Sequence, residues 1–189
     1  MNILYVVIIL VQIGVIVYFY KKGRKPKAEQ PDNAADENSY EGSRALAFKV
    51  TASQLGLNIP ADATFVYGLI MDWNTGDAVV SLATYITGAA NLFISTGGGL
   101  QGGGKSPEAG VAAVKLVSAA AEYADRTVPV TDISGMPAPG CVRFYFLTNK
   151  YTSVVQEQVQ HLTDGSSQWG ELFEKSNLVI GEMSQMNQQ

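Results

Sequence analysis

An unbroken apolar run at the N-terminus constrains the chain more than any other feature of its sequence. The run extends from Ile3 to Tyr20 without a charge, and thirteen of its eighteen residues are Ile, Val, Leu or Phe. At about 1.5 Å per residue, a helix of this length reaches roughly 27 Å, close to the thickness of a bilayer's hydrocarbon core. We therefore expect residues 1–27 to form a transmembrane anchor, with Ile3–Tyr20 in the lipid bilayer. The basic flank consists of Lys21, Lys22, Arg24, Lys25 and Lys27.

The charges around the run predict its orientation. No Lys or Arg precedes it, whereas five of the thirteen in the chain follow it directly. A cleaved signal peptide has the opposite arrangement, with its positive residues before the apolar stretch and small residues after it. By the positive-inside rule, a single pass would leave the N-terminus outside and the rest of the chain in the cytoplasm. The lone cysteine, Cys141, agrees with a reducing compartment.

The segment after the anchor is acidic. Residues 28–41 contain Pro31, no basic residue and five acids, which is the composition of a flexible linker. From residue 28 onward the chain carries eight basic and seventeen acidic residues, a net charge of −9. This charge argues against a nucleic-acid partner. Residues 42–189 remain for one cytoplasmic domain, which is long enough to enclose a core.

The first half of this domain predicts a meander. Arg44–Leu57 is helical in part, and Thr51-Ala52-Ser53-Gln54 fits a capping box at the start of a short helix. The apolar runs Phe65–Trp73, Ala78–Ile86 and Ala90–Thr96 are separated by short turns. Strands joined so closely must pair antiparallel.

The second half adds a central helix, a strand and a final helix. Ser106 as N-cap and Pro107 at the first helical position start a helix that runs to about Asp125. This helix is apolar on most of its circumference, and its polar stripe repeats every seven residues at Glu108, Lys115 and Glu122.

Cys141–Asn149 predicts a fourth strand, and Thr152–Leu162 is ambiguous, with helix at its end. The strand alternates, with Val142, Phe144 and Phe146 on one face and Tyr145 and Leu147 on the other. A final helix begins near Gln168, with an apolar side made of Leu172, Phe173, Val179, Ile180, Met183 and Met186. The pattern predicts an α+β domain in which helices pack on an antiparallel sheet of four or five strands, of about the size of profilin-like or roadblock-like modules.

A glycine-rich segment precedes the central helix. Residues 99–106 (GLQGGGKS) satisfy the P-loop pattern, in which glycine amides hold phosphate, the lysine reaches a terminal phosphate and the serine binds Mg²⁺. Two observations oppose nucleotide hydrolysis. The glycine run satisfies the spacing almost by itself, and the next strand ends Leu147-Thr148-Asn149, without a metal-binding Asp. The candidate ligand- or partner-binding residues are Gly97, Gly98, Gly99, Gly102, Gly103, Gly104, Lys105 and Ser106.

Nucleophilic and metal chemistry have little support in the sequence. His161 is the only histidine and no cysteine lies near it in the sequence, so we expect no metal site. Cys141 fits a small core residue better than a nucleophile with His161 as its base. Asp72, Asp77 and Asp132 could converge, although acids in turns usually cap them. No catalytic residue and no cofactor is predicted.

Two tryptophans leave a choice open. Trp73 and Trp169 are either exposed anchors of a protein interface or ordinary core aromatics, and the second interpretation is slightly favoured. The methionine-bearing last helix fits both closure of the core and formation of a homo-oligomer.

Three stretches resemble a family of small bacterial proteins of unknown function: FVYGLIM (65–71), LFISTGGGLQGGG (92–104) and PAPGCVRFYFLT (137–148). A closing helix like Leu172–Met186 follows them, so the resemblance covers about residues 50–186. It implies a compact bacterial domain with the glycine loop as its special surface, but no activity. A bacterial origin, taken together with the anchor at Ile3–Tyr20, predicts a location in the inner membrane. In that family an acid or a small residue often stands in place of Lys105, which would make the P-loop match accidental.

Two hypotheses follow for the function. The first is a membrane-anchored cytoplasmic interaction or scaffold module with a protein partner. The alternative is a sensor that binds a phosphate ligand or nucleotide at Gly102–Ser106.

Overall fold

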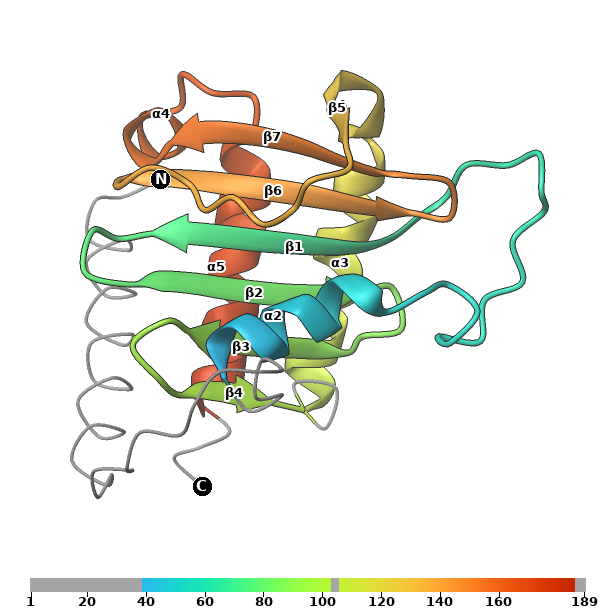
Figure 1. Cartoon of the computed structure of the whole chain (residues 1–189), viewed down its shortest axis with the longest axis horizontal. Helices are drawn as coiled ribbons and strands as arrows, with labels where there is room; N and C mark the ends of the chain where they lie inside the picture. The colour runs from blue at the N-terminus through green and yellow to red at the C-terminus, as the bar shows by residue number, and fades with distance from the viewer. Residues whose placement is uncertain (1–38, 103–105, 186–189) are drawn as a thin grey trace.

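The protein folds around a seven-stranded antiparallel sheet in the computed structural model, which describes residues 39–102 and 106–185. The strand order is β4-β3-β2-β1-β6-β7-β5. Helix α2 lies on one face of the sheet, and α3 and α5 lie on the other (Figure 1). The strands are β1 (Val66–Asn74), β2 (Val79–Tyr85), β3 (Ala90–Ile94), β4 (Gly99–Gln101), β5 (Val128–Val130), β6 (Cys141–Thr148) and β7 (Thr152–Gln158). The helices are α2 (Tyr40–Lys49), α3 (Pro107–Ala121), α4 (Val159–Asp164) and α5 (Gly170–Gln185), with a 3₁₀ turn η2 (Ala124–Arg126) after α3.

The predicted α+β class and the antiparallel meander are confirmed, but the sheet has more strands than the four or five expected. The additional strands are the short edges β4 and β5 and the strand β7. An edge position suits β5, because Pro129 has no N–H to offer a further strand. The ambiguous segment divides into β7 and then α4, so the helix expected at its end is present.

Alternation along β6 divides the core into two clusters, as predicted. Val142, Phe144 and Phe146 pack toward α3 and α5, whereas Tyr145 and Leu147 pack toward α2. The tryptophans belong to the first cluster, where Trp73 is 3 % and Trp169 is 5 % exposed. The interface-anchor interpretation is therefore wrong for both, and the core interpretation is confirmed.

The start of α3 is confirmed, whereas its end is not. The Ser106 side chain accepts a hydrogen bond from the Ala109 amide at 3.2 Å, and Pro107 occupies the first turn. The helix ends at Ala121 instead of Asp125. The amides of Glu122 and Tyr123 already bond to carbonyls three residues back, and this tightening ends the α-helix.

The helix before β1 is displaced from its prediction. The capping box forms, with Thr51 N donating to Gln54 Oε1 at 2.8 Å and Gln54 N donating to Thr51 Oγ1 at 3.3 Å. It closes a turn instead of starting a helix, and α2 spans Tyr40–Lys49. The last two residues of the predicted linker are therefore helical.

The predicted anchor, Ile3–Tyr20, lies outside the described residues. Within residues 39–102 and 106–185, no helix is both long and apolar enough to cross a bilayer.

Candidate functional site

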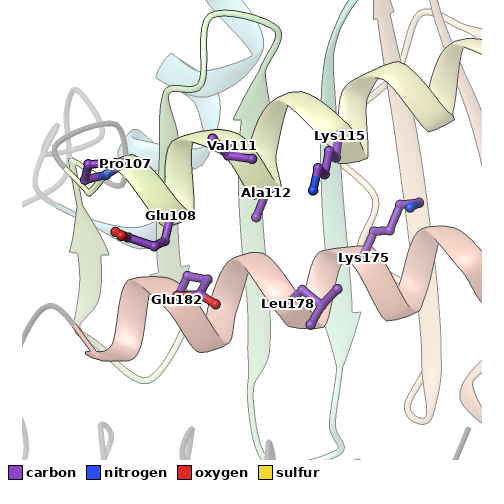
Figure 2. Close-up of a pocket in the computed structure, with 8 residues that line it drawn as sticks. All are labelled: Pro107, Glu108, Val111, Ala112, Lys115, Lys175, Leu178 and Glu182. Atoms are coloured by element: carbon purple, nitrogen blue, oxygen red, sulfur yellow. The ribbon is translucent and has the colours of Figure 1, made fainter.

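Helices α3 and α5 lie side by side on one face of the sheet and run antiparallel (Figures 1 and 2). Small buried residues on α3, among them Ala109, Ala113 and Ala120, allow this helix to pack closely. The buried side of α5 is bulkier, with Leu172, Phe173 and Ile180 in the same cluster. Because these buried sides pack on the sheet, the opposite sides of α3 and α5 face solvent.

The outer sides enclose a groove of about 430 Å³, which we call the α3–α5 groove. Its lining residues come from both helices and are shown in Figure 2: Pro107, Glu108, Val111, Ala112, Lys115, Lys175, Leu178 and Glu182. The centre is apolar, and its two large side chains are exposed, Val111 by 54 % and Leu178 by 44 %. An apolar centre between charged ends is typical of a surface that binds protein.

The charges of the groove are separated by sign. Glu108 and Glu182 lie at one end, and Lys115 and Lys175 lie at the other (Figure 2). Two of the four have local partners: Ser106 Oγ donates to Glu108 Oε2 at 3.0 Å, and Lys175 Nζ lies 3.5 Å from Glu171 Oε1. Like charges therefore face each other across each end of the groove.

A buried polar cluster on the opposite face holds α2 on the sheet. Asp72 is fully buried, and Arg44 donates to its Oδ2 from Nε at 2.9 Å and from Nη2 at 2.6 Å. Ser81 donates to the other oxygen, Oδ1. Burial opposes the charge on Arg44, but the hydrogen bond and the charge of Asp72 prevail and raise the pKa of the guanidinium. With both carboxylate oxygens occupied, Asp72 fits a structural role better than acid–base chemistry.

The three aspartates of the sequence analysis do not converge on a metal site. Asp77 and Asp132 are exposed, and Asp132 accepts hydrogen bonds from the amide and hydroxyl of Ser134 in its own turn. Among the described residues, no group of three or more His, Cys, Asp or Glu side chains could hold a metal ion.

His161 and Cys141 have separate surroundings. The imidazole Nδ1 of His161, on α4, lies 2.9 Å from Oε1 of Glu157 near the end of β7. Cys141 is half-buried at the start of β6, where it pairs with Gln158 of β7. Neither contact makes His161 a base for Cys141.

Part of the glycine-rich segment has a structural explanation. Gly97, at φ +102°, donates to Ile94 O in the turn between β3 and β4. A Cβ on Gly99 would lie 2.1 Å from Leu92 O, so β4 could not pair with β3. Gly98 also has a positive φ, and the Gly102 amide donates to Asn91 Oδ1 at 3.3 Å. Ser106 caps α3, and the remaining candidates, Gly103, Gly104 and Lys105, lie outside the described residues.

Most of the groove was not visible as a site from the sequence. The spacing of Glu108 and Lys115 predicts a polar stripe, but it does not relate this stripe to Lys175, Leu178 and Glu182. A signal was present, because Lys175 and Glu182 are also seven residues apart, with the opposite order of charge.

The comparisons with known proteins add no function: no protein-family model, curated protein or solved structure matches the chain. The bacterial resemblance therefore stays a prediction, and the function is argued from the residues.

Proposed function

We propose that this chain is a membrane-anchored interaction module of the bacterial inner membrane, whose cytoplasmic domain binds a protein partner in the α3–α5 groove. The observation that carries the proposal is the exposed pair Val111 and Leu178 at the centre of an open groove. Burying two such side chains releases water from apolar surface, which is the main favourable term in most protein association.

The shape and charges of the groove favour a helical partner surface. A groove between two helices that lie side by side accepts the side-chain ridge of another helix. The partner would carry apolar residues at its centre and basic residues over Glu108 and Glu182. Acidic residues would lie over the other end, at Lys115 and Lys175.

The membrane part of the proposal rests on the N-terminal sequence. Ile3–Tyr20 would span the bilayer with its N-terminus outside, and the linker would give the domain a reach of roughly 20 Å. Membrane fractionation, with protease added to sealed inverted vesicles, tests this arrangement. The C-terminal domain should be digested, and protection of the domain would contradict the orientation.

The phosphate-sensor alternative has less support. The turn and the close approach to Leu92 account for Gly97 and Gly99, and the Ser106 hydroxyl already caps α3. A thermal-shift series with inorganic phosphate and Mg²⁺–nucleotides tests it, because a ligand at a hundred times its Kd stabilises by about 2.7 kcal/mol. A shift that disappears in Lys105→Ala would favour the sensor.

Site-specific photo-crosslinking tests the groove. A photoreactive amino acid would replace Val111 in the full-length chain in native membranes, and Val128, an exposed valine on β5, would be the matched control position. We expect a defined crosslinked product from position 111 that is lost with Leu178→Asp. Equal patterns from positions 111 and 128, or products insensitive to Leu178→Asp, would contradict the proposal.

A further inference from the structure

The two helices of the groove carry the same pattern in opposite directions. On α3, Glu108 precedes Val111 by three residues and Lys115 by seven. On α5, Lys175 precedes Leu178 by three residues and Glu182 by seven. Seven residues are nearly two helical turns, about 10.5 Å, so each set lies along one stripe of its helix.

From this pattern we infer that the groove binds the same groove of a second copy of the chain. The inference rests on the proposed function and names its partner. The two copies would meet face to face, related by a two-fold axis that lies in the interface and runs across both helices. Each α3 would then lie antiparallel on the partner's α3, and each α5 on the partner's α5.

The charges select this orientation. The two-fold rotation reverses the long direction of the groove, so Glu108 lies over the partner's Lys115 and Glu182 lies over the partner's Lys175. Symmetry repeats both pairs, which gives four attractive contacts. An axis along the groove would instead place Glu108 over the partner's Glu182, and like charges in direct contact oppose association.

The apolar centre fits the same axis. The midpoint between Glu108 and Lys115 falls half a residue beyond Val111, and the midpoint between Lys175 and Glu182 falls half a residue beyond Leu178. Half a residue is about 0.75 Å along a helix, so both side chains lie almost on the axis and meet their own copies. A surface that is complementary to itself in this way is the definition of an isologous interface.

The existing partners of the charged groups leave this arrangement open. The pair between Lys175 and Glu171 is an exposed i,i+4 contact, worth about 0.3–0.5 kcal/mol, and an ammonium has three donors. The bond from Ser106 occupies one oxygen of Glu108, and within residues 39–102 and 106–185 the other oxygen has no hydrogen-bond partner. Because exposed ion pairs are weak, the charges set orientation more than affinity. Anchors in one membrane would supply the high local concentration that a weak dimer needs.

Cysteine crosslinking of the full-length chain in membranes tests the geometry. In a Cys141→Ser background, Val111→Cys and Leu178→Cys are each introduced alone, and the membranes are oxidised with copper–phenanthroline. Each variant should form a disulfide-linked dimer. Glu182→Cys is the control within the groove, because the two copies of this residue would lie at opposite ends. Val128→Cys is the control outside it. Equal crosslinking at positions 111, 178, 182 and 128 would overturn the inference.

Charge reversal on α3 tests the identity of the partner. Lys115→Glu in the Val111→Cys background places a glutamate against the partner's Glu108 in both symmetry-related contacts. We expect the dimer yield to fall about tenfold. Adding Glu108→Lys restores opposite charges between two copies of the same variant, so the yield should recover. Lys49→Glu, on the exposed end of α2 across the sheet, is the matched control and should change nothing.

The double reversal separates this inference from the proposed function. A different protein partner would meet two wrong charges in Glu108→Lys/Lys115→Glu, so its binding would fall further instead of recovering. A further fall in the double variant would overturn the inference that the partner is a second copy. If position 111 still forms its photo-crosslink when Glu108 and Lys115 are unchanged, the proposed interaction module would remain supported. If position 111 also crosslinks no better than position 128, both fail.

Discussion

The two faces of the sheet are covered in different ways. The α3 and α5 face is closed by two long helices over a large cluster of aliphatic and aromatic side chains, and the buried hydroxyls of Ser176 and Ser184 donate to carbonyls of their own helix, α5. The α2 face has one ten-residue helix and the loop after β5 (Figure 1). Its core includes several tyrosines and the buried pair Arg44–Asp72. One face is therefore held by the area it buries, and the other by specific polar contacts.

The hydroxyl groups show how the second face works. Tyr85 OH donates to Ala47 O at 2.7 Å, Tyr67 OH donates to Val50 O at 2.9 Å, and Tyr145 OH donates to Gly135 O at 3.1 Å. Each bond ties the sheet to the end of α2 or to a covering loop. A short helix with little apolar surface can slide on a sheet, and directional bonds fix its position. Burial therefore gives stability on one face of the sheet, and hydrogen bonds fix the position of the covering segments on the other.

The largest effect is expected from a cavity on the α3 and α5 face. Phe173 is fully buried and packs edge-on against Trp73, with ring centroids 5.3 Å apart. Phe173→Ala should lower the free energy of unfolding by about 3–5 kcal/mol, measured by urea denaturation of residues 39–189. A loss below about 1 kcal/mol would mean that this face is not held by close packing.

The matching change on the α2 face removes one member of the ion pair. Arg44→Ala leaves the carboxylate of Asp72 buried, with Ser81 as its one remaining side-chain donor among the described residues, and should cost about 3 kcal/mol. The double variant Arg44→Met/Asp72→Leu removes both charges and should recover most of that loss. If the double variant is as unstable as the single one, the loss in Arg44→Ala does not come from an unpaired buried charge, and apolar packing cannot replace the polar contacts of this face.

Much of the fold was accessible from the sequence, because local patterns specify local structure. The alternation along β6 predicted which side chains face each helix layer, and Ser106-Pro107 predicted the start of α3. The pair Arg44–Asp72 was not predictable, because its members are 28 residues apart and nothing local relates them. The groove was missed for the same reason: its charge order has meaning only once α3 and α5 are known to be antiparallel neighbours.

Alkaline pH should weaken the α2 face selectively. Burial, and then the nearby Asp72 charge, raise the pKa of Tyr40 from 10.0 to about 12. Because the pKa is higher in the folded chain, the stabilisation is complete below pH 10 and is lost as the pH rises toward 12. Two pKa units correspond to about 2–3 kcal/mol. Urea unfolding at pH 9 and pH 12 should show a smaller loss in Tyr40→Phe than in the parent, and equal losses would contradict this assignment.

The smallest effect is expected on the outer side of the first face. Lys115 is exposed, and within residues 39–102 and 106–185 it forms no hydrogen bond or ion pair. Lys115→Glu should therefore change the free energy of unfolding by less than about 0.5 kcal/mol. The same substitution is expected to reduce crosslinking between copies about tenfold. Together, the free energy of unfolding and the crosslinking yield would distinguish the two sides of α3. Its inner side would determine the stability of the domain, and its outer side would determine the association of two copies. If Lys115→Glu destabilised the domain by more than about 1 kcal/mol, a weaker dimer would report unfolding instead of a lost contact.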